Sequence, residues 1–120
     1  MRVLLLATIL ALGLTGACAP QDPDRITRGR ALYQRTCSVC HGAEGLGMPG
    51  LGRSLRDSDF VRHLSEREMV EFLKVGRRRN DPANVTGVDM PPRGGNAAYT
   101  DEDLALMAAF IKDLATQPME

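Results

Sequence analysis

Two segments rich in glycine and proline limit what this chain of 120 residues can form. The first, 42–52 (GAEGLGMPGLG), has five glycines in eleven residues, and the second is 77–96 (RRRNDPANVTGVDMPPRGGN). Both are predicted to be loops, because glycine and proline clusters interrupt helices and strands. Structureless loops of this length in a small domain usually serve a ligand or are disordered. The chain is therefore predicted to fold around something it binds.

Outside these loops, apolar residues recur at helical spacing, and no segment alternates as a half-buried strand would. Asp22 or Asp24 is expected to cap the first helix, and Ser65 with Glu68 forms a capping box before another. Thr100 is expected to cap the last helix. The predicted fold class is all-α, with about half the chain irregular and helical segments at 24–36, 58–63, 65–76 and 100–114.

Composition excludes some classes of protein. With 43% hydrophobic and 25% charged residues, the chain has ordinary globular usage and is not expected to be disordered. The 15 Lys and Arg balance the 15 Asp and Glu, and there is no long basic run, which argues against a nucleic-acid partner. Only 4% of the residues are aromatic and none is Trp, so the core of so small a domain would be marginal by itself. We expect a ligand to fill its centre.

The sequence Cys37-Ser38-Val39-Cys40-His41 indicates which ligand that is. C-x-x-C-H is the attachment site of haem c: two thiols on one helical turn reach the vinyl groups at one porphyrin edge, and the next residue places its imidazole beneath the iron. Cys37 and Cys40 are the predicted thioether residues, and His41 is a predicted iron ligand. The alternatives are a thioredoxin-type dithiol, which needs a βαβ scaffold, a zinc site completed by His63, and a structural disulfide.

Several motifs, in the same order, resemble the class I c-type cytochromes over residues 24–117. They are Gly29 and Tyr33, then CSVCHG at 37–42, GLGMPGLG at 45–52, VDMPPRGG at 88–95 and the helix at 101–114. The resemblance implies that the first and last helices cross. Shorter helices and long loops would then wrap one covalently bound haem. At the crossing, Gly29 and Tyr33 are expected to meet Met107 and Phe110.

The sixth iron ligand is predicted to be Met90. Met69 and Met107 lie on apolar helix stripes, where Met is a common core residue, and Met119 is close to the end of the chain. Met48 follows His41 too closely to reach the far face of the porphyrin. Met90 has room for a helix before it, and Pro91 biases it toward extended backbone. In the resembling family, Met followed by Pro-Pro and a Gly pair is similarly the axial ligand; His63 is the alternative.

Other residues are expected around the haem. A ligating His normally donates its second ring N–H to a carbonyl, and the segment that would supply it is Gly52-Arg53-Ser54-Leu55, with Arg53 where the family often has proline. Four apolar residues are candidates for haem packing or for plain core: Leu51, Leu55, Phe72 and Val88. Four arginines form either a cationic patch near the haem or a solvated loop: Arg77, Arg78, Arg79 and Arg93.

The N-terminal residues predict export. Arg2 precedes an apolar run at 3–14, which would rise roughly 18 Å as a helix and is too short for the roughly 30 Å hydrocarbon layer. Residues 1–17 are therefore predicted to be a signal peptide. Small residues lead into Cys18 as in a bacterial lipobox, so Cys18 is predicted to be lipidated, with 18–23 as a tether to the domain at 24–117. The alternatives are cleavage after Ala17 or Ala19, giving a soluble periplasmic protein, and an uncleaved anchor.

With His and Met both on the iron, no position stays open for oxygen or peroxide, so the sequence predicts an electron carrier and not an enzyme. The expected function is one-electron transfer between respiratory oxidoreductases on the periplasmic side of the membrane. Its expected partners are redox proteins, and the chain is expected to be a monomer or a complex subunit. The alternatives are a dedicated cytochrome subunit of a dehydrogenase or terminal oxidase, and a haem sensor or peroxidase.

Overall fold

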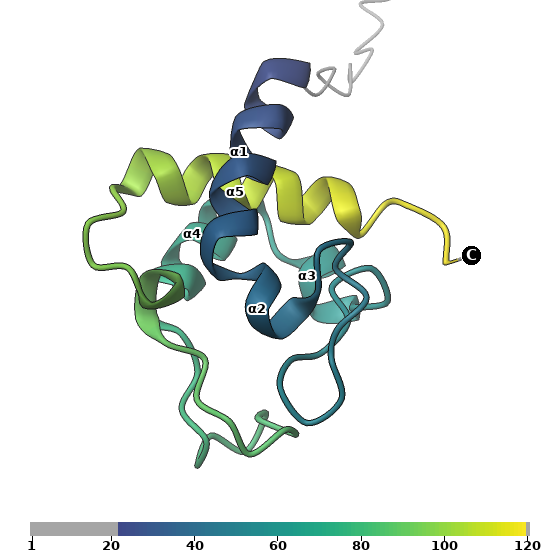
Figure 1. Cartoon of the computed structure of the whole chain (residues 1–120), viewed down its shortest axis with the longest axis vertical. Helices are drawn as coiled ribbons and strands as arrows, with labels where there is room; N and C mark the ends of the chain where they lie inside the picture. Colours follow the sequence, from purple (N-terminus) through teal and green to yellow (C-terminus); the bar gives the residue numbers. More distant parts are fainter. Residues whose placement is uncertain (1–21, 120) are drawn as a thin grey trace, which may run out of the picture.

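The structure, a computed structural model, describes residues 22–119 and is built from short helices joined by long loops (Figure 1). Within that range no residues form a strand, and the extended pairing consists of two isolated bridges, Met48 with Gly52 and Arg77 with Met90. The predicted all-α class is confirmed. In chain order, the elements are α1 (Pro23–Thr36), α2 (Ser38–His41), α3 (Asp59–His63), α4 (Glu66–Val75), the 3-10 turn η1 (Pro92–Gly95) and α5 (Asp101–Leu114).

The expected signal peptide at 1–17 and the lipidation site Cys18 lie outside the described residues. Most of the expected tether at 18–23 lies outside them too, and the structure changes only its end, because α1 already begins at Pro23 with Asp22 as its N-cap. The Asp22 carboxylate accepts a hydrogen bond from the backbone N–H of Asp24 at 3.0 Å. Proline suits the first helical position, since its φ is preset and it has no N–H to leave unpaired there.

Two later helices start with the capping hydrogen bonds that the sequence predicts. Ser65 and Glu68 exchange the two bonds of a capping box at the start of α4, and Thr100 and Asp103 do the same at α5. Asp59–His63 is the expected short turn. The segment 77–96 is not loop throughout, because η1 forms a turn within it, in which Arg93 has a φ of 53°.

No helix among residues 22–119 has the length and apolar character needed to cross a membrane.

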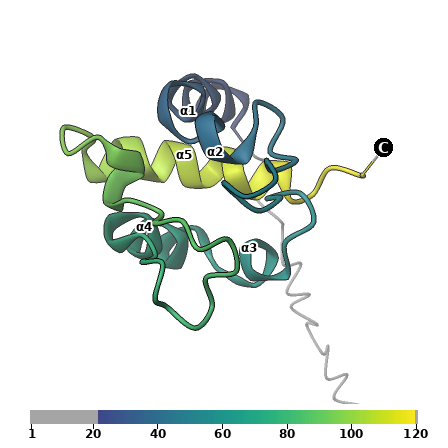
Figure 2. The same cartoon turned by 60° about the horizontal axis from the view of Figure 1, so that its bottom comes forward.

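The core is arranged around α5, which lies between α1 and α2 on one side and α3 and α4 on the other (Figure 2). Much of α5 is buried, because its small and large apolar residues meet helices on both sides. The largest fully buried side chains come from α1 and α5: Tyr33, Leu104, Met107 and Leu114.

The expected crossing of the first and last helices is present (Figure 1). Gly29 is buried, and a Cβ built on it would lie 2.0 Å from the backbone oxygen of Leu106, so only glycine allows this approach. The rings of Tyr33 and Phe110 meet edge to face, with centroids 5.1 Å apart. Met107 extends toward the cysteine motif, its Sδ 4.0 Å from Sγ of Cys37.

Gly29→Ala is expected to destabilise the protein although alanine favours helix. The gain in helix propensity is about 1 kcal/mol, whereas forcing a methyl group against the α5 backbone costs about 3 kcal/mol, leaving a net loss of about 2 kcal/mol. Chemical denaturation followed by far-ultraviolet circular dichroism measures this. Thr27→Ala, at an exposed position of the same helix, is the control. A Gly29→Ala protein as stable as the wild type would show that the crossing is loose.

Candidate haem site

The two cysteines of the motif lie at the junction of α1 and α2. The backbone N–H of Cys37 bonds the carbonyl of Tyr33 at 2.9 Å, so the chain turns into α2 without leaving helical geometry. Cys37 and Cys40 are half-buried free thiols and are not joined to each other. Burial raises the pKa of the Cys37 thiol, because an apolar environment disfavours the charged thiolate.

His41 ends α2 and is oriented by a hydrogen bond. Its Nδ1 lies 2.8 Å from the carbonyl oxygen of Arg53. A carbonyl only accepts, so Nδ1 carries the proton and Nε2 keeps its lone pair for a metal. Arg53 is the residue expected to supply this carbonyl. Glycine at position 52 lets the backbone before Arg53 pass close to the cysteine motif, because a Cβ there would lie 2.5 Å from the carbonyl oxygen of Cys40.

Two neighbouring cavities lie beside the motif, enclosing about 730 Å³ and 640 Å³ of empty space, part of it open to solvent. All four apolar residues expected to pack against haem line one of them: Leu51 and Val88 the first, Leu55 and Phe72 the second. Five residues line both: Cys37, His41, Arg53, Arg77 and Met90.

The candidates for the sixth ligand differ in where their side chains lie. Met90 is half-buried and lines both cavities, as His41 does. Met69 lines the second cavity but is 2% exposed within the core. Met48 is 40% exposed and lines neither, and Met119 and His63 are exposed too. The Nδ1 of His63 lies 2.7 Å from the carbonyl of Asp59, in its own helix.

Backbone pairing holds Met90 in place. Its N–H donates to the carbonyl of Arg77 at 2.8 Å, and its carbonyl accepts from the N–H of Arg77 at 2.9 Å. Next to this bridge, Gly76 ends α4 with a φ of 69°, and a Cβ there would lie 2.2 Å from the Met90 carbonyl oxygen. The residue expected to ligate iron is therefore joined to the end of α4.

Three of the four arginines of this region, Arg77, Arg79 and Arg93, are held in side-chain contacts within the domain, whereas Arg78 is exposed. Arg79 pairs with Asp89 at 3.1 Å and lowers the pKa of that carboxyl, and Arg93 pairs with Asp101 at 2.9 Å. The guanidinium of Arg77 lies over the rings of Phe60 and Phe72, 4.8 and 5.0 Å from their centroids.

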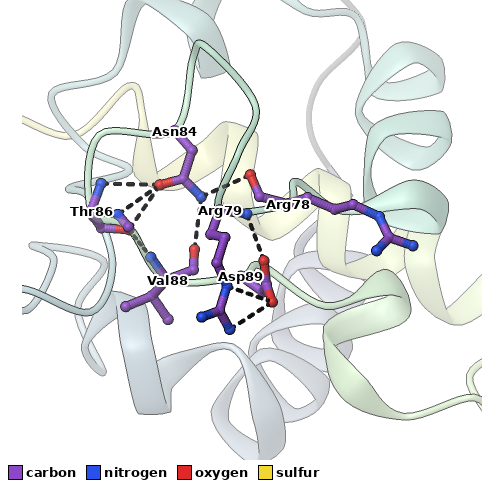
Figure 3. A network of polar contacts seen from close by, with 7 residues as sticks. Arg78, Arg79, Asn84, Thr86, Val88 and Asp89 are labelled. Atoms are coloured by element: carbon purple, nitrogen blue, oxygen red, sulfur yellow. Dashed lines mark hydrogen bonds and ion pairs between the residues drawn. The ribbon is translucent and has the colours of Figure 1, made fainter.

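Asn84 lines the first cavity and is a residue that the sequence analysis did not single out. Its side chain bonds several backbone groups of the loop at 77–90 (Figure 3). A usable signal was present in Asn84-Val85-Thr86-Gly87, since asparagine near glycine favours a turn closed by its own side chain.

The donor set fits haem c. The two cavities are bordered by two thiols that form no disulfide, by an imidazole whose Nε2 carries no proton and by a thioether. A zinc site is not supported, because no three His, Cys, Asp or Glu side chains come together anywhere in 22–119.

Comparisons with known proteins agree with this chemistry. A family model described as cytochrome C oxidase, cbb3-type, subunit III matches residues 24–111. The chain is 29% identical over 98 residues to the cbb3-type cytochrome c oxidase subunit CcoP of Rubrivivax gelatinosus, covering 82% of this chain and 29% of that protein. It is 25% identical over 95 residues to subunit FixP of Sinorhizobium medicae, covering 79% and 32%. The chain thus spans about a third of these relatives.

Among solved structures, the crystal structure of the c-type cytochrome XoxG from Methylobacterium extorquens AM1 matches with a TM-score of 0.58 and 25% identity, over 76% of this chain and 50% of that one. Fold, cavity chemistry and family model lead to one conclusion. The chain belongs to the family described as cytochrome c oxidase, cbb3-type, subunit III, and it is an electron-transfer protein with a class I c-type cytochrome domain and covalently bound haem c.

Proposed function

We propose that this protein is a one-electron carrier in which Cys37 and Cys40 hold the haem and His41 and Met90 are its axial ligands. The supporting observation is that His41 and Met90, from separate segments, line the same two cavities. When bound, the haem iron accepts and releases one electron. The Met90 thioether favours Fe(II) and raises the potential relative to two nitrogen ligands.

The chain's own residues prepare the site for this task. The Arg53 carbonyl keeps His41 in one tautomer, and the bridge to Arg77 keeps Met90 at the cavity wall. Arg77 lines both cavities and supplies a positive charge suited to the propionate carboxylates of haem. With both axial positions taken by the protein, the site transfers electrons without binding a small substrate.

Redox titration followed by visible spectroscopy tests this function. We expect one reversible one-electron transition, and no carbon monoxide adduct of the reduced protein at neutral pH. Rapid binding of carbon monoxide to the wild type would instead favour a sensor or peroxidase, in which the sixth ligand leaves the iron.

We also propose that the domain works on the extracytoplasmic side of the membrane, tethered by lipid at Cys18. Cys18→Ser is expected to release the protein from the membrane fraction without changing its visible spectrum. Several acyl chains anchor a protein stably where a single one does not, so the wild type should resist a high-salt wash. Fractionation and immunoblotting measure this. Wild-type protein removed by salt alone would contradict the lipid anchor.

A second candidate function is that of a fixed subunit of an oxidase or dehydrogenase complex that passes electrons to one partner. It is favoured by the two relatives, both of them subunits of cbb3-type oxidases. Purification in mild detergent separates the two functions. A free carrier elutes alone at the size of one domain, whereas a subunit co-purifies with its complex at constant stoichiometry.

A further inference from the structure

The loop at 77–90, here called the Met90 loop, is held in shape mainly by polar contacts. None of its residues is fully buried, so apolar packing contributes little to its conformation. Its two ends are joined by the backbone bridge between Arg77 and Met90. One step inward, the Asp89 carboxylate accepts bonds from the backbone and the guanidinium of Arg79. These contacts close the base of the loop. They do not hold the stretch at 80–88, which needs other contacts.

The side-chain amide of Asn84 holds that interior (Figure 3). Its Oδ1 accepts from the N–H of Thr86 at 3.1 Å, from the Thr86 hydroxyl at 3.3 Å and from the N–H of Gly87 at 2.9 Å. Its Nδ2 donates to the carbonyl of Arg78 at 3.1 Å and to that of Val88 at 2.7 Å. One amide thus links the outgoing and returning halves of the loop.

Of these five bonds, the one to Val88 bears most directly on the site. Val88 lines the first cavity and is two residues from Met90, so a fixed Val88 carbonyl limits where the Met90 backbone can go. The amide uses both its acceptor oxygen and its donor NH2. Only a side chain that accepts on one side and donates on the other can therefore replace it. Aspartate has the acceptors and lacks the donors; alanine lacks both.

We propose that Asn84 is a positioning residue for the axial ligand: its amide closes the Met90 loop and thereby keeps the Met90 thioether at the iron. The proposal rests on the assignment of Met90 as the ligand. Without the amide, the loop is joined only at its base, where the Arg77 bridge remains, and the stretch at 80–88 can take other shapes. The Met90 sulfur then leaves the iron more often, while the helices keep their packing because the side-chain hydrogen bonds of Asn84 all lie within the loop.

The test compares Asn84→Ala with Asn80→Ala, a change of the same type at an exposed position of the same loop. Ferric haem with a thioether on iron has a weak charge-transfer absorption at the red end of the spectrum. We expect Asn84→Ala to lose at least half of this band, to lower the midpoint potential, and to bind carbon monoxide at least tenfold faster when reduced. Asn80→Ala should match the wild type, and the far-ultraviolet helix signal should be unchanged in both.

Asn84→Asp separates the two halves of the amide. It keeps the acceptor for Thr86 and Gly87 but loses the donor to Val88, so we expect its band and potential to fall between wild type and Asn84→Ala. If Asn84→Ala keeps the wild-type band and potential, the positioning role is wrong. The positioning role is equally wrong if Asn84→Ala and Asn84→Asp both lose the helix signal together with the band, because Asn84 would then support the whole fold.

Met90→Ala distinguishes failure of this proposal from failure of the ligand assignment. If Met90→Ala abolishes the band and Asn84→Ala does not affect it, Met90 is the ligand and Asn84 does not position it. If Met90→Ala leaves the band intact, the ligand assignment itself fails, and the role of Asn84 fails with it.

Discussion

Met90→Ala is expected to abolish the red charge-transfer band of the ferric protein, because alanine has no sulfur to place on the iron. Loss of the thioether removes a soft ligand that favours Fe(II), so the midpoint potential should fall by on the order of 100 mV. The vacated position should let the reduced protein bind carbon monoxide. Visible spectroscopy, a redox titration and carbon monoxide binding measure the three effects, and the covalent haem should remain attached.

Met48→Ala is the matched control for this variant. Met48 is 40% exposed and lines neither cavity, so its removal should leave the band and the potential as they are. A band that survives Met90→Ala, or that vanishes with Met48→Ala, would overturn the ligand assignment. The cytochrome fold would stand in either case.

Replacing both Cys37 and Cys40 by alanine is expected to leave an apoprotein that has lost most of its helix signal. The two cavities beside the motif are then unfilled, and the aromatic-poor core of so small a domain does not offset the loss. Covalent haem stabilises the folded state because its apolar ring is buried and its iron is ligated only when the chain is folded. Far-ultraviolet circular dichroism at 25 °C measures the helix content.

Extraction into acidified organic solvent tests the attachment separately. The wild-type haem should stay with the polypeptide, whereas haem added to the double variant, which cannot form thioether bonds, should move into the solvent. Val39→Ala, between the two cysteines and 65% exposed, is the control and should retain both haem and helix. A double variant that keeps its helix content without haem would show that the fold does not depend on the cofactor.

The helices and their caps were predictable from the sequence because the signals are local. Ser65 and Glu68, or Thr100 and Asp103, are three residues apart, and each pair satisfies backbone groups of the turn that contains it. The Arg53 carbonyl was predictable for a different reason, since the backbone supplies it whatever the side chain. The start of α1 was missed because Pro23 reads as a tether residue, although proline also suits the first turn of a helix.

Apart from the turn signal at Asn84, the sequence reveals little of how the long loop is held. Few apolar residues mark its contacts, and its shape comes from Asn84 and from the pairing of Arg79 with Asp89, ten residues apart. The stacking of Arg77 on Phe60 and Phe72 likewise depends on where α3 and α4 meet. Such contacts join segments whose separation follows no helical or strand period, so no periodic signal points to them.

The close approach at Gly29 also bears on how the chain tolerates changes in length. Gly29 lies in the first helix of the described chain and Leu106 in the last. Their contact therefore closes the whole stretch of chain between them into one loop. The entropic cost of closing such a loop grows only logarithmically with its length, by about 0.6 kcal/mol for each doubling. Adding a few residues to either glycine-rich loop would therefore hardly weaken the crossing. The lengths of these loops are constrained by the cavities they line.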